Sequence, residues 1–270
     1  MAVSFPHKDH YTVDDLLQIM QLLRSPDGCP WDREQTHESI RTDFLEETHE
    51  ALEAINNEDA AALEEELGDV LLQVVFHSRI EEEKGVFAFG DVVDGICKKL
   101  IIRHPHVFGE TTVDSTGQVL QNWDAIKRRT KGDKSQADLL GSVPRTLPAL
   151  MRAAKVQNRA RRVGFDWPEV TGALEALDSE TAELKEAIAA GDADAVEEEL
   201  GDLLFSAVNV SRFVKSDAEQ ALTRATDKFI RRFRLVERLA AARGISMAEA
   251  PLEQLDELWR EAKKDVETSH

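Results

Sequence analysis

The sequence has little cysteine and a deficit of positive charge. Its 270 residues include two cysteines, Cys29 and Cys97, which lie far apart and without metal-ligand spacing. Neither a disulfide framework nor a zinc site is indicated. The formal charge of −19 opposes binding to nucleic acid polymers or anionic lipid, because both need a basic protein surface. A small anionic ligand would need a local positive site or a metal.

The sequence also has no long apolar run and no glycine-rich phosphate loop, and we expect no secretory leader. No apolar stretch approaches the length of a membrane span, and the start, MAVSFPHKDH, lacks a basic segment followed by an apolar core. We therefore expect no membrane partner and a cytoplasmic location. Without a Walker-type loop, phosphate would have to be bound by metal and side chains.

Helical periodicity dominates the chain, and alternation of β-branched residues is scarce, so the expected fold is all-α. Thr12 and Asp15 resemble a capping box at the start of the first helix. We expect helices at about 12–24, 36–55, 60–83, 91–102 and 115–129, with a loop at 103–106. Residues 131–146 mix Gly, Ser, Asp and Pro, and this composition predicts a linker between domains at 1–130 and 147–270.

Two pairs of acidic residues flank a turn-prone segment, Asn56-Asn57-Glu58-Asp59. The members of each pair are three residues apart and so share a helix face. If the two helices fold back on each other, residue 47 lies level with residue 69 and residue 50 with residue 66, because both of these pairs are symmetric about position 58. The four side chains that are expected to converge are Glu47, Glu50, Glu66 and Asp69.

The same arrangement recurs 133 positions later without a gap, in Glu180, Glu183, Glu199 and Asp202. The local strings also agree, EEELGDVLL near 64 and EEELGDLLF near 197, and the second hairpin is centred on Gly191. The tryptophans Trp31 and Trp167 recur at a shift of 136. A unit of this length that occurs twice indicates a duplicated domain rather than a solenoid.

Each acidic cluster is a candidate Mg²⁺ site. Like charges at this spacing repel unless a cation lies among them, and Mg²⁺ takes oxygen ligands from a few carboxylates, waters and phosphates. A single glutamate in such a run is more often part of a solvated helix face. Symmetric placement in two copies favours the metal site, whereas the neighbouring Glu64, Glu65, Glu197 and Glu198 are expected to face solvent.

The motif E-E-x-x-E, a spacer and E-x-x-D resembles the signature of the MazG family of nucleoside triphosphate pyrophosphohydrolases. It is carried by Glu46, Glu47, Glu50, Glu66 and Asp69, and again by the second set, in which Ser179 replaces the first glutamate. The resemblance extends over nearly the whole chain and indicates the two-repeat form. It implies an all-α homodimer that uses Mg²⁺, with Mn²⁺ as an alternative, to cleave nucleoside triphosphates to monophosphate and pyrophosphate. It also implies that the C-terminal repeat is the main catalytic unit.

Basic pairs are the candidates for binding the substrate phosphates. Lys228 and Arg232 are four residues apart on one expected helix face, as are Lys99 and Arg103 in the first copy. The alternative is that they form ion pairs with the surplus acids. Trp259 is a candidate for stacking on a base, although a tryptophan at helical spacing is more often part of the core.

Two other classes of protein fit part of the pattern. A four-helix di-metal oxidase also uses carboxylates on facing helices, and Glu46 with His49 supplies one E-x-x-H. That class needs a second such motif, and the second copy has Ser179 and Ala182 at the matching places. An acidic helical scaffold without catalysis would leave the symmetry of the two clusters unexplained.

Overall fold

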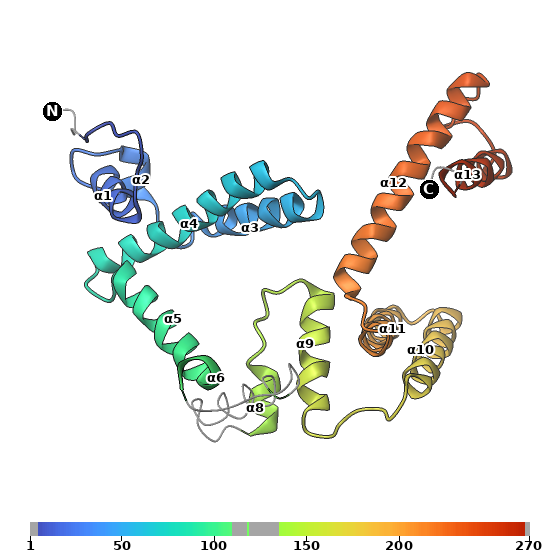
Figure 1. Ribbon diagram of the computed structural model, residues 1–270. Helices are drawn as coiled ribbons and strands as arrows, with labels where there is room; N and C mark the ends of the chain where they lie inside the picture. The colour runs from blue at the N-terminus through green and yellow to red at the C-terminus, as the bar shows by residue number, and fades with distance from the viewer. Residues whose placement is uncertain (1–4, 110–117, 119–134, 268–270) are drawn as a thin grey trace. The chain divides into compact units, whose positions relative to one another are not determined.

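The computed structural model describes residues 5–109, 118 and 135–267, and in these residues every regular element is a helix (Figure 1). This confirms the all-α prediction. The chain divides into two compact units, Met1–Gly132 and Asp133–His270, and the division falls inside the predicted linker. The helix predicted at 115–129 lies outside the described residues.

The first unit is built around a helical hairpin. The helices α3 and α4 pack against each other, and α1 and α5 both contact α4. Its core contains Met20, Ile40, Val75, Phe76 and Ile80. The described helices of this unit are α1 (Val13–Leu23), α2 (Pro30–Glu34), α3 (Arg41–Asn56), α4 (Ala60–Glu83), α5 (Phe89–Arg103) and α6 (Pro105–Phe108).

The second unit repeats the hairpin with α10 and α11 and extends it with a long amphipathic helix, α12, that packs against α13. Val236, Ala240, Leu258 and Ala262 form the core between α12 and α13. The described helices are α8 (Gln136–Gly141), α9 (Ala149–Arg161), α10 (Val170–Ala190), α11 (Ala193–Phe213), α12 (Ala218–Ala242) and α13 (Leu252–Glu267).

The two hairpin turns use the residues that the sequence provides for them. In the first, Glu58 has a φ of 55°, and the Asp59 side chain accepts bonds from the backbone N–H groups of Ala61 and Ala62. In the second, Gly191 has a φ of 72°, which glycine adopts without strain, and Asp192 caps α11 in the same way. Each pair of helices is therefore held antiparallel, which aligns residues equidistant from the turn.

Several predicted boundaries differ from the structure. Thr12 and Asp15 do form the predicted capping box, and the helix predicted at 60–83 has these bounds in α4. The helix predicted from 36 begins at Arg41, because a separate short helix, α2, and a turn precede it. Pro105 starts the short helix α6 where a loop was predicted, and residues 136–141 of the predicted linker form α8.

Candidate active site

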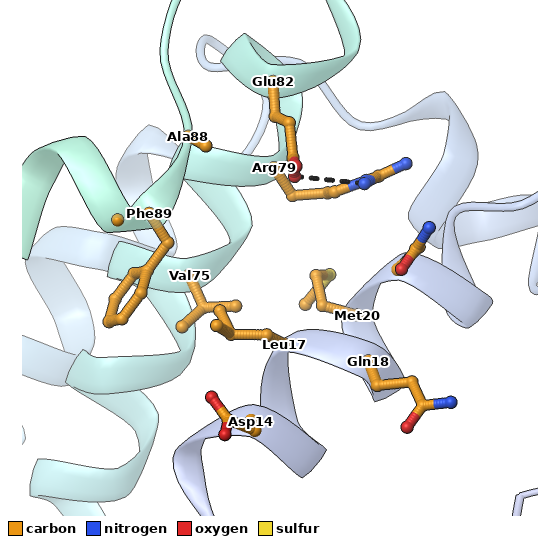
Figure 2. A pocket seen from close by; sticks show the side chains of 11 residues that line it. Asp14, Leu17, Gln18, Met20, Val75, Arg79, Glu82, Ala88 and Phe89 are labelled. Carbon is orange, nitrogen blue, oxygen red and sulfur yellow. Dashed lines mark hydrogen bonds and ion pairs between the residues drawn. The ribbon is translucent and has the colours of Figure 1, made fainter.

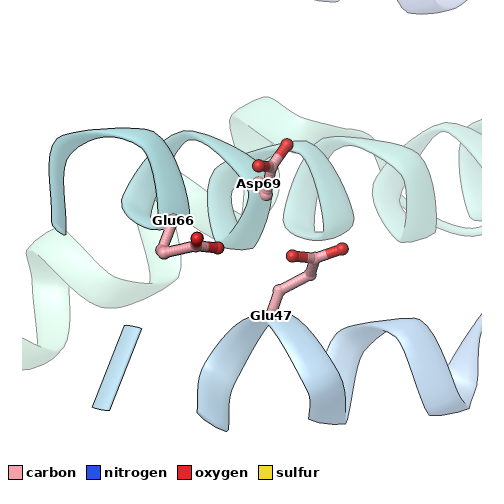
Figure 3. A group of neighbouring side chains, drawn as sticks. All are labelled: Glu47, Glu66 and Asp69. Carbon is pink, nitrogen blue, oxygen red and sulfur yellow. The ribbon is translucent and has the colours of Figure 1, made fainter. Parts of the chain in front are cut away.

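Three carboxylates of the first unit meet between the helices of its hairpin. Glu47 on α3 faces Glu66 and Asp69 on α4, as Figure 3 shows. One carboxylate oxygen from each residue lies within 4.8 Å of the others, and all three residues are half-buried. This spacing suits a cation bound between them.

The second unit contains the matching group. Glu180 on α10 and Glu199 and Asp202 on α11 also present oxygens within 4.8 Å of one another. Glu180 and Glu199 are half-buried, and Asp202 is exposed. Within the described parts of the chain, these are the two groups of three or more potential ligand residues. The internal repeat therefore produces two sites of the same geometry.

The fourth predicted ligand of each cluster lies nearby but outside the group of three. Glu50 and Glu183 are exposed, yet the charge of each raises the pKa of the two glutamates in the group of three of its own unit. The Ser179 hydroxyl, at the position of the missing motif glutamate, donates to Oε1 of Glu183 at 2.9 Å. Their coordination of a metal stays a prediction.

The charges within each cluster are not compensated. Burial and the surrounding acids raise the pKa of Glu47 and Glu66 above the usual range in the first unit, and the same causes raise the pKa of Glu180 and Glu199 in the second. No cation is among the causes of these shifts. Mutual repulsion of half-buried carboxylates is the condition that a bound hard cation relieves.

The expected solvent-facing acids behave differently. Glu64, Glu65, Glu197 and Glu198 are all exposed, as predicted. Glu46 and His49, which form the E-x-x-H pattern of a di-metal oxidase, are exposed and belong to neither group of three. The structure therefore gives no support to an oxidase site at that motif.

The basic pairs lie on the predicted helices. Lys228 and Arg232 lie on α12, and Lys99 and Arg103 on α5. Both lysines are exposed and both arginines half-buried. None of the four is among the charges that shift the carboxylate pKa values. Phosphate binding by these residues stays a prediction.

Trp259 packs against its own chain and is not an exposed aromatic surface. It is half-buried on α13 and packs on the core between α12 and α13, with its ring centroid 5.0 Å from that of Phe229. The packing matches the alternative that the sequence left open, and a role in base stacking stays a prediction. Trp123, which precedes Trp259 by the same shift of 136 positions and was predicted to have the same role in the first copy, lies outside the described residues.

A cavity in each unit lies next to the hairpin and was not predicted. In the first unit it has a volume of about 300 Å³ and lies between α1, α4 and the start of α5. Figure 2 shows Leu17, Met20 and Val75 on its walls and the ion pair between Arg79 and Glu82, at 3.1 Å. Arg79 recurs as Arg212 under the shift of 133 positions, and each arginine lines the cavity of its own unit, so this recurrence is the sequence signal that could have found the cavities.

In the second unit the cavity is larger, about 410 Å³, and is lined by α8, α9, α11 and the segment 164–167. Asp166 accepts two hydrogen bonds from the Arg212 guanidinium, one of them at 2.9 Å, and these lower the pKa of the Asp166 carboxyl. Arg212 Nη2 also donates to Asn209 Oδ1 at 2.6 Å. The cavity wall is thus fixed by an arginine that binds two neighbouring residues.

Comparison with known proteins agrees with the geometry. The MazG nucleotide pyrophosphohydrolase domain model matches residues 35–108 and 169–236, which include both hairpins. Over 255 residues the chain is 47% identical to the nucleoside triphosphate pyrophosphohydrolase/pyrophosphatase MazG of Thermotoga maritima, covering 94% of this chain and 97% of that protein.

Two further relatives are similar over most of the chain. The nucleoside triphosphate pyrophosphohydrolase of Escherichia coli K12 is 46% identical over 257 residues, covering 93% of this chain and 97% of that protein. The uncharacterized protein YabN of Bacillus subtilis is 47% identical over 247 residues, covering 91% of this chain and 50% of that protein. Fold and site define an all-α protein with twin carboxylate sites. This chain belongs to the MazG nucleotide pyrophosphohydrolase family.

The raised pKa values generate a pH-dependent prediction. A carboxyl with a higher pKa in the folded than in the unfolded chain binds more protons when folded, so its contribution destabilises the fold as the pH rises above the ordinary value of 4.5. Glu199→Gln removes this contribution. In the absence of divalent metal, the unfolding free energy of the variant relative to the wild type should therefore increase between about pH 4 and about pH 8. Urea titrations across this range measure it.

Glu197→Gln is the matched control, because it makes the same charge change on an exposed face of α11. Its difference from the wild type should depend much less on pH. A Glu199→Gln difference that is flat with pH would show that repulsion within the cluster is absent.

Proposed function

We propose that this protein hydrolyses nucleoside triphosphates to nucleoside monophosphate and pyrophosphate in a Mg²⁺-dependent reaction. The observation that supports this most strongly is the convergence of three carboxylates between the helices of each hairpin, within the segments that match the MazG domain. The names of the Thermotoga and Escherichia relatives supply the reaction. The net charge of −19 opposes non-specific binding to a nucleic acid polymer.

The metal ligands of the proposed main site are Glu180, Glu183, Glu199 and Asp202. Mg²⁺, or Mn²⁺ in its place, prefers such oxygen ligands and, when bound, polarises a phosphoryl oxygen and lowers the pKa of a coordinated water. The first unit offers the equivalent set, Glu47, Glu50, Glu66 and Asp69.

The chain's own residues have two further tasks. One of the inner carboxylates would accept the proton of the attacking water. Lys228 and Arg232 would neutralise charge on the departing pyrophosphate, since arginine binds phosphate through two N–H groups and lysine supplies a point charge. Lys99 and Arg103 are the equivalent pair in the first unit.

A homodimer is part of the proposal. Every residue from 220 to 231 on α12 is exposed. Leu222, Phe229, Ile230 and Phe233 on this helix have 55%, 54%, 43% and 40% of their surface exposed. An apolar stripe on a helix of 25 residues is a typical helix-packing surface. Packing of α12 against a second copy would also bring Lys228 and Arg232 into the environment of that copy.

None of the helices in the described parts of the chain combines the length and the apolar content that a membrane span requires. We propose the cytoplasm, where nucleoside triphosphates are present, as the place of action. Removal of non-standard nucleotides and control of signalling nucleotides both fit this chemistry.

Product analysis tests the reaction directly. Incubation with canonical and damaged triphosphates and Mg²⁺ should release pyrophosphate and the corresponding monophosphate, because the metal site activates the phosphoanhydride nearest the nucleoside. Ion-exchange chromatography separates the products. Release of orthophosphate without pyrophosphate would contradict the proposed reaction.

The two repeats should differ in activity. Asp69 and Lys99 are 30 positions apart, whereas Asp202 and Lys228 are 26 positions apart. Relative to the carboxylates, the lysine of one copy is therefore displaced from that of the other by about one helical turn, ~5 Å. We expect Asp202→Asn to lower kcat/KM about 100-fold or more. Asp69→Asn should keep about a third or more of the wild-type kcat/KM. Steady-state kinetics measures kcat/KM for both variants, after their folding and oligomeric state have been shown to match the wild type.

The paired design carries its own control, because each variant makes the same chemical change at the equivalent position. A larger loss for Asp69→Asn than for Asp202→Asn would assign catalysis to the first repeat instead.

A further inference from the structure

Two histidines of the first unit are hydrogen-bonded to each other. The Nδ1 atoms of His37, in the turn that precedes α3, and His77, on α4, are 2.7 Å apart. The ring planes are inclined by 16° and the ring centroids are 5.0 Å apart, so the two rings meet edge to edge. One proton fits between the facing nitrogens, whereas two protons would bring two N–H donors against each other.

Glu81 determines where the protons of this pair lie. Its Oε1 is 2.6 Å from Nε2 of His37, and hydrogen bonds from Lys84 and His37 lower the pKa of the Glu81 carboxyl. An ionised carboxylate only accepts, so Nε2 of His37 carries a proton. The proton between the Nδ1 atoms comes either from His77, with both rings neutral, or from His37 as an imidazolium. The pair therefore keeps its bond with no extra proton or with one, and loses it with two.

The separation of the two nitrogens identifies a proton site rather than a metal site. Two imidazole ligands of one tetrahedral Zn²⁺ ion, at Zn–N distances of about 2.0–2.1 Å, place their nitrogens ~3.3 Å apart. The observed 2.7 Å is instead the length of a hydrogen bond. In the described parts of the chain, neither histidine belongs to a group of three potential metal ligands.

The pair lies on the wall of a surface groove of about 540 Å³ between α3, α4 and the chain around the start of α5. Burial in this wall and the charge of His37 lower the pKa of His77. Phe87 and Val92, on the α5 side, bring no charge to the groove. The charged groups around the pair are two acids and two bases, Glu38, Glu81, Arg41 and Lys84. These charges balance, so a second positive charge on the pair is not compensated.

The histidine bond ties the turn at 37–40 to α4. The side-chain hydrogen bonds of Thr36 and Ser39 are local. In the described chain, His37 is the residue of this turn whose side chain bonds to α4. Ile40, which is 1% exposed, adds an apolar anchor in the core. Since α3 begins directly after the turn, the histidine pair also restrains the start of that helix.

The second unit forms its hairpin without this pair. Under the shift of 133 positions, Val170 and Val210 stand where the first unit has His37 and His77, and Val214 stands in place of Glu81. A hairpin of this kind therefore does not need the two imidazoles, and the pair is a feature of the first unit.

We propose that His37 and His77 form a pH-sensitive clasp that holds the start of α3 against α4. At neutral pH the shared proton closes the clasp. In acid a second proton makes both rings imidazolium, the two Nδ1–H groups repel each other, and the turn at 37–40 separates from α4 on the groove side while Ile40 keeps it on the core. This device is separate from the proposed reaction.

The pKa of His77 gives the direction of the effect on stability. The folded chain binds the proton of His77 at lower pH than the unfolded chain, for which the ordinary value is 6.5. The unfolded state therefore binds more protons as the pH falls through this value, and the first unit loses stability there. The pKa of Glu81 is also lowered, and its contribution is lost only in more acid solution, below its ordinary value of 4.5.

Nuclear magnetic resonance of the full chain, labelled with ¹⁵N in histidine, tests the clasp directly. At about pH 7.5 a scalar coupling across the hydrogen bond should join the two Nδ1 atoms, and at about pH 5 it should be lost as both rings become imidazolium. The signals are assigned from the His77→Val variant. Absence of the coupling at about pH 7.5, or its persistence at about pH 5, would overturn the proposal. The wild-type measurement does not depend on whether a variant folds.

Hydrogen exchange measures the consequence for α3. His77→Val introduces the residue of the second unit, and at about pH 7.5 the amides of residues 44–48 should exchange about 5-fold faster than in the wild type, because one hydrogen bond is lost. At about pH 5 the clasp of the wild type is open and this ratio should approach one. His49→Val makes the same change at an exposed histidine of α3, and its ratio should be equal at both pH values. A His77→Val ratio that does not change with pH would contradict the clasp.

Discussion

Repulsion between half-buried carboxylates on facing helices is the constraint on which this structure depends. Each hairpin brings one glutamate from its first helix against a glutamate and an aspartate of its second. The raised pKa values of Glu47, Glu66, Glu180 and Glu199 record the cost of that arrangement. A cation bound between them would relieve this repulsion, and the same cation would polarise a bound phosphate in the reaction that we propose.

The two hairpins hold these carboxylates in the same way. The two units differ in the side chains that surround the hairpin. In the first unit, Phe76 completes a core with Met20 and Ile80, and the neighbouring cavity is small. In the second unit, Asn209 and Arg212 line a larger cavity beside α11. At this position of the hairpin, the first repeat therefore has a buried apolar residue and the second has polar residues on a cavity wall.

Features set by local sequence were predictable. Helical periodicity and the turns at Glu58 and Gly191 are properties of neighbouring residues, and antiparallel packing follows from a short turn. These features together placed the carboxylates of the clusters without reference to a structure. The symmetry of the acids about each turn carried more information than any single glutamate, because solvated glutamates are common on helices.

Features set by distant contacts were not predictable. The partnership of Arg212 with Asp166 joins positions 46 residues apart, and Gln157 reaches Phe205 across 48 residues. Neither pair has a periodic signature. The orientation of Glu183 toward Ser179 depends on rotamers rather than on spacing. The packing of Trp259 on Phe229 likewise follows from how α13 folds back on α12.

The central claim is that the carboxylate clusters bind a divalent cation, and thermal unfolding with and without Mg²⁺ tests it most directly. Mg²⁺ should raise the melting temperature of the wild type, because it binds the folded state, and Glu183→Gln combined with Glu199→Gln should reduce that increase. Glu186→Gln combined with Glu197→Gln removes the same charge from exposed positions on the same two helices and should keep the full increase. If the Glu183/Glu199 variant responds to Mg²⁺ as strongly as the wild type, the second cluster is not a metal site.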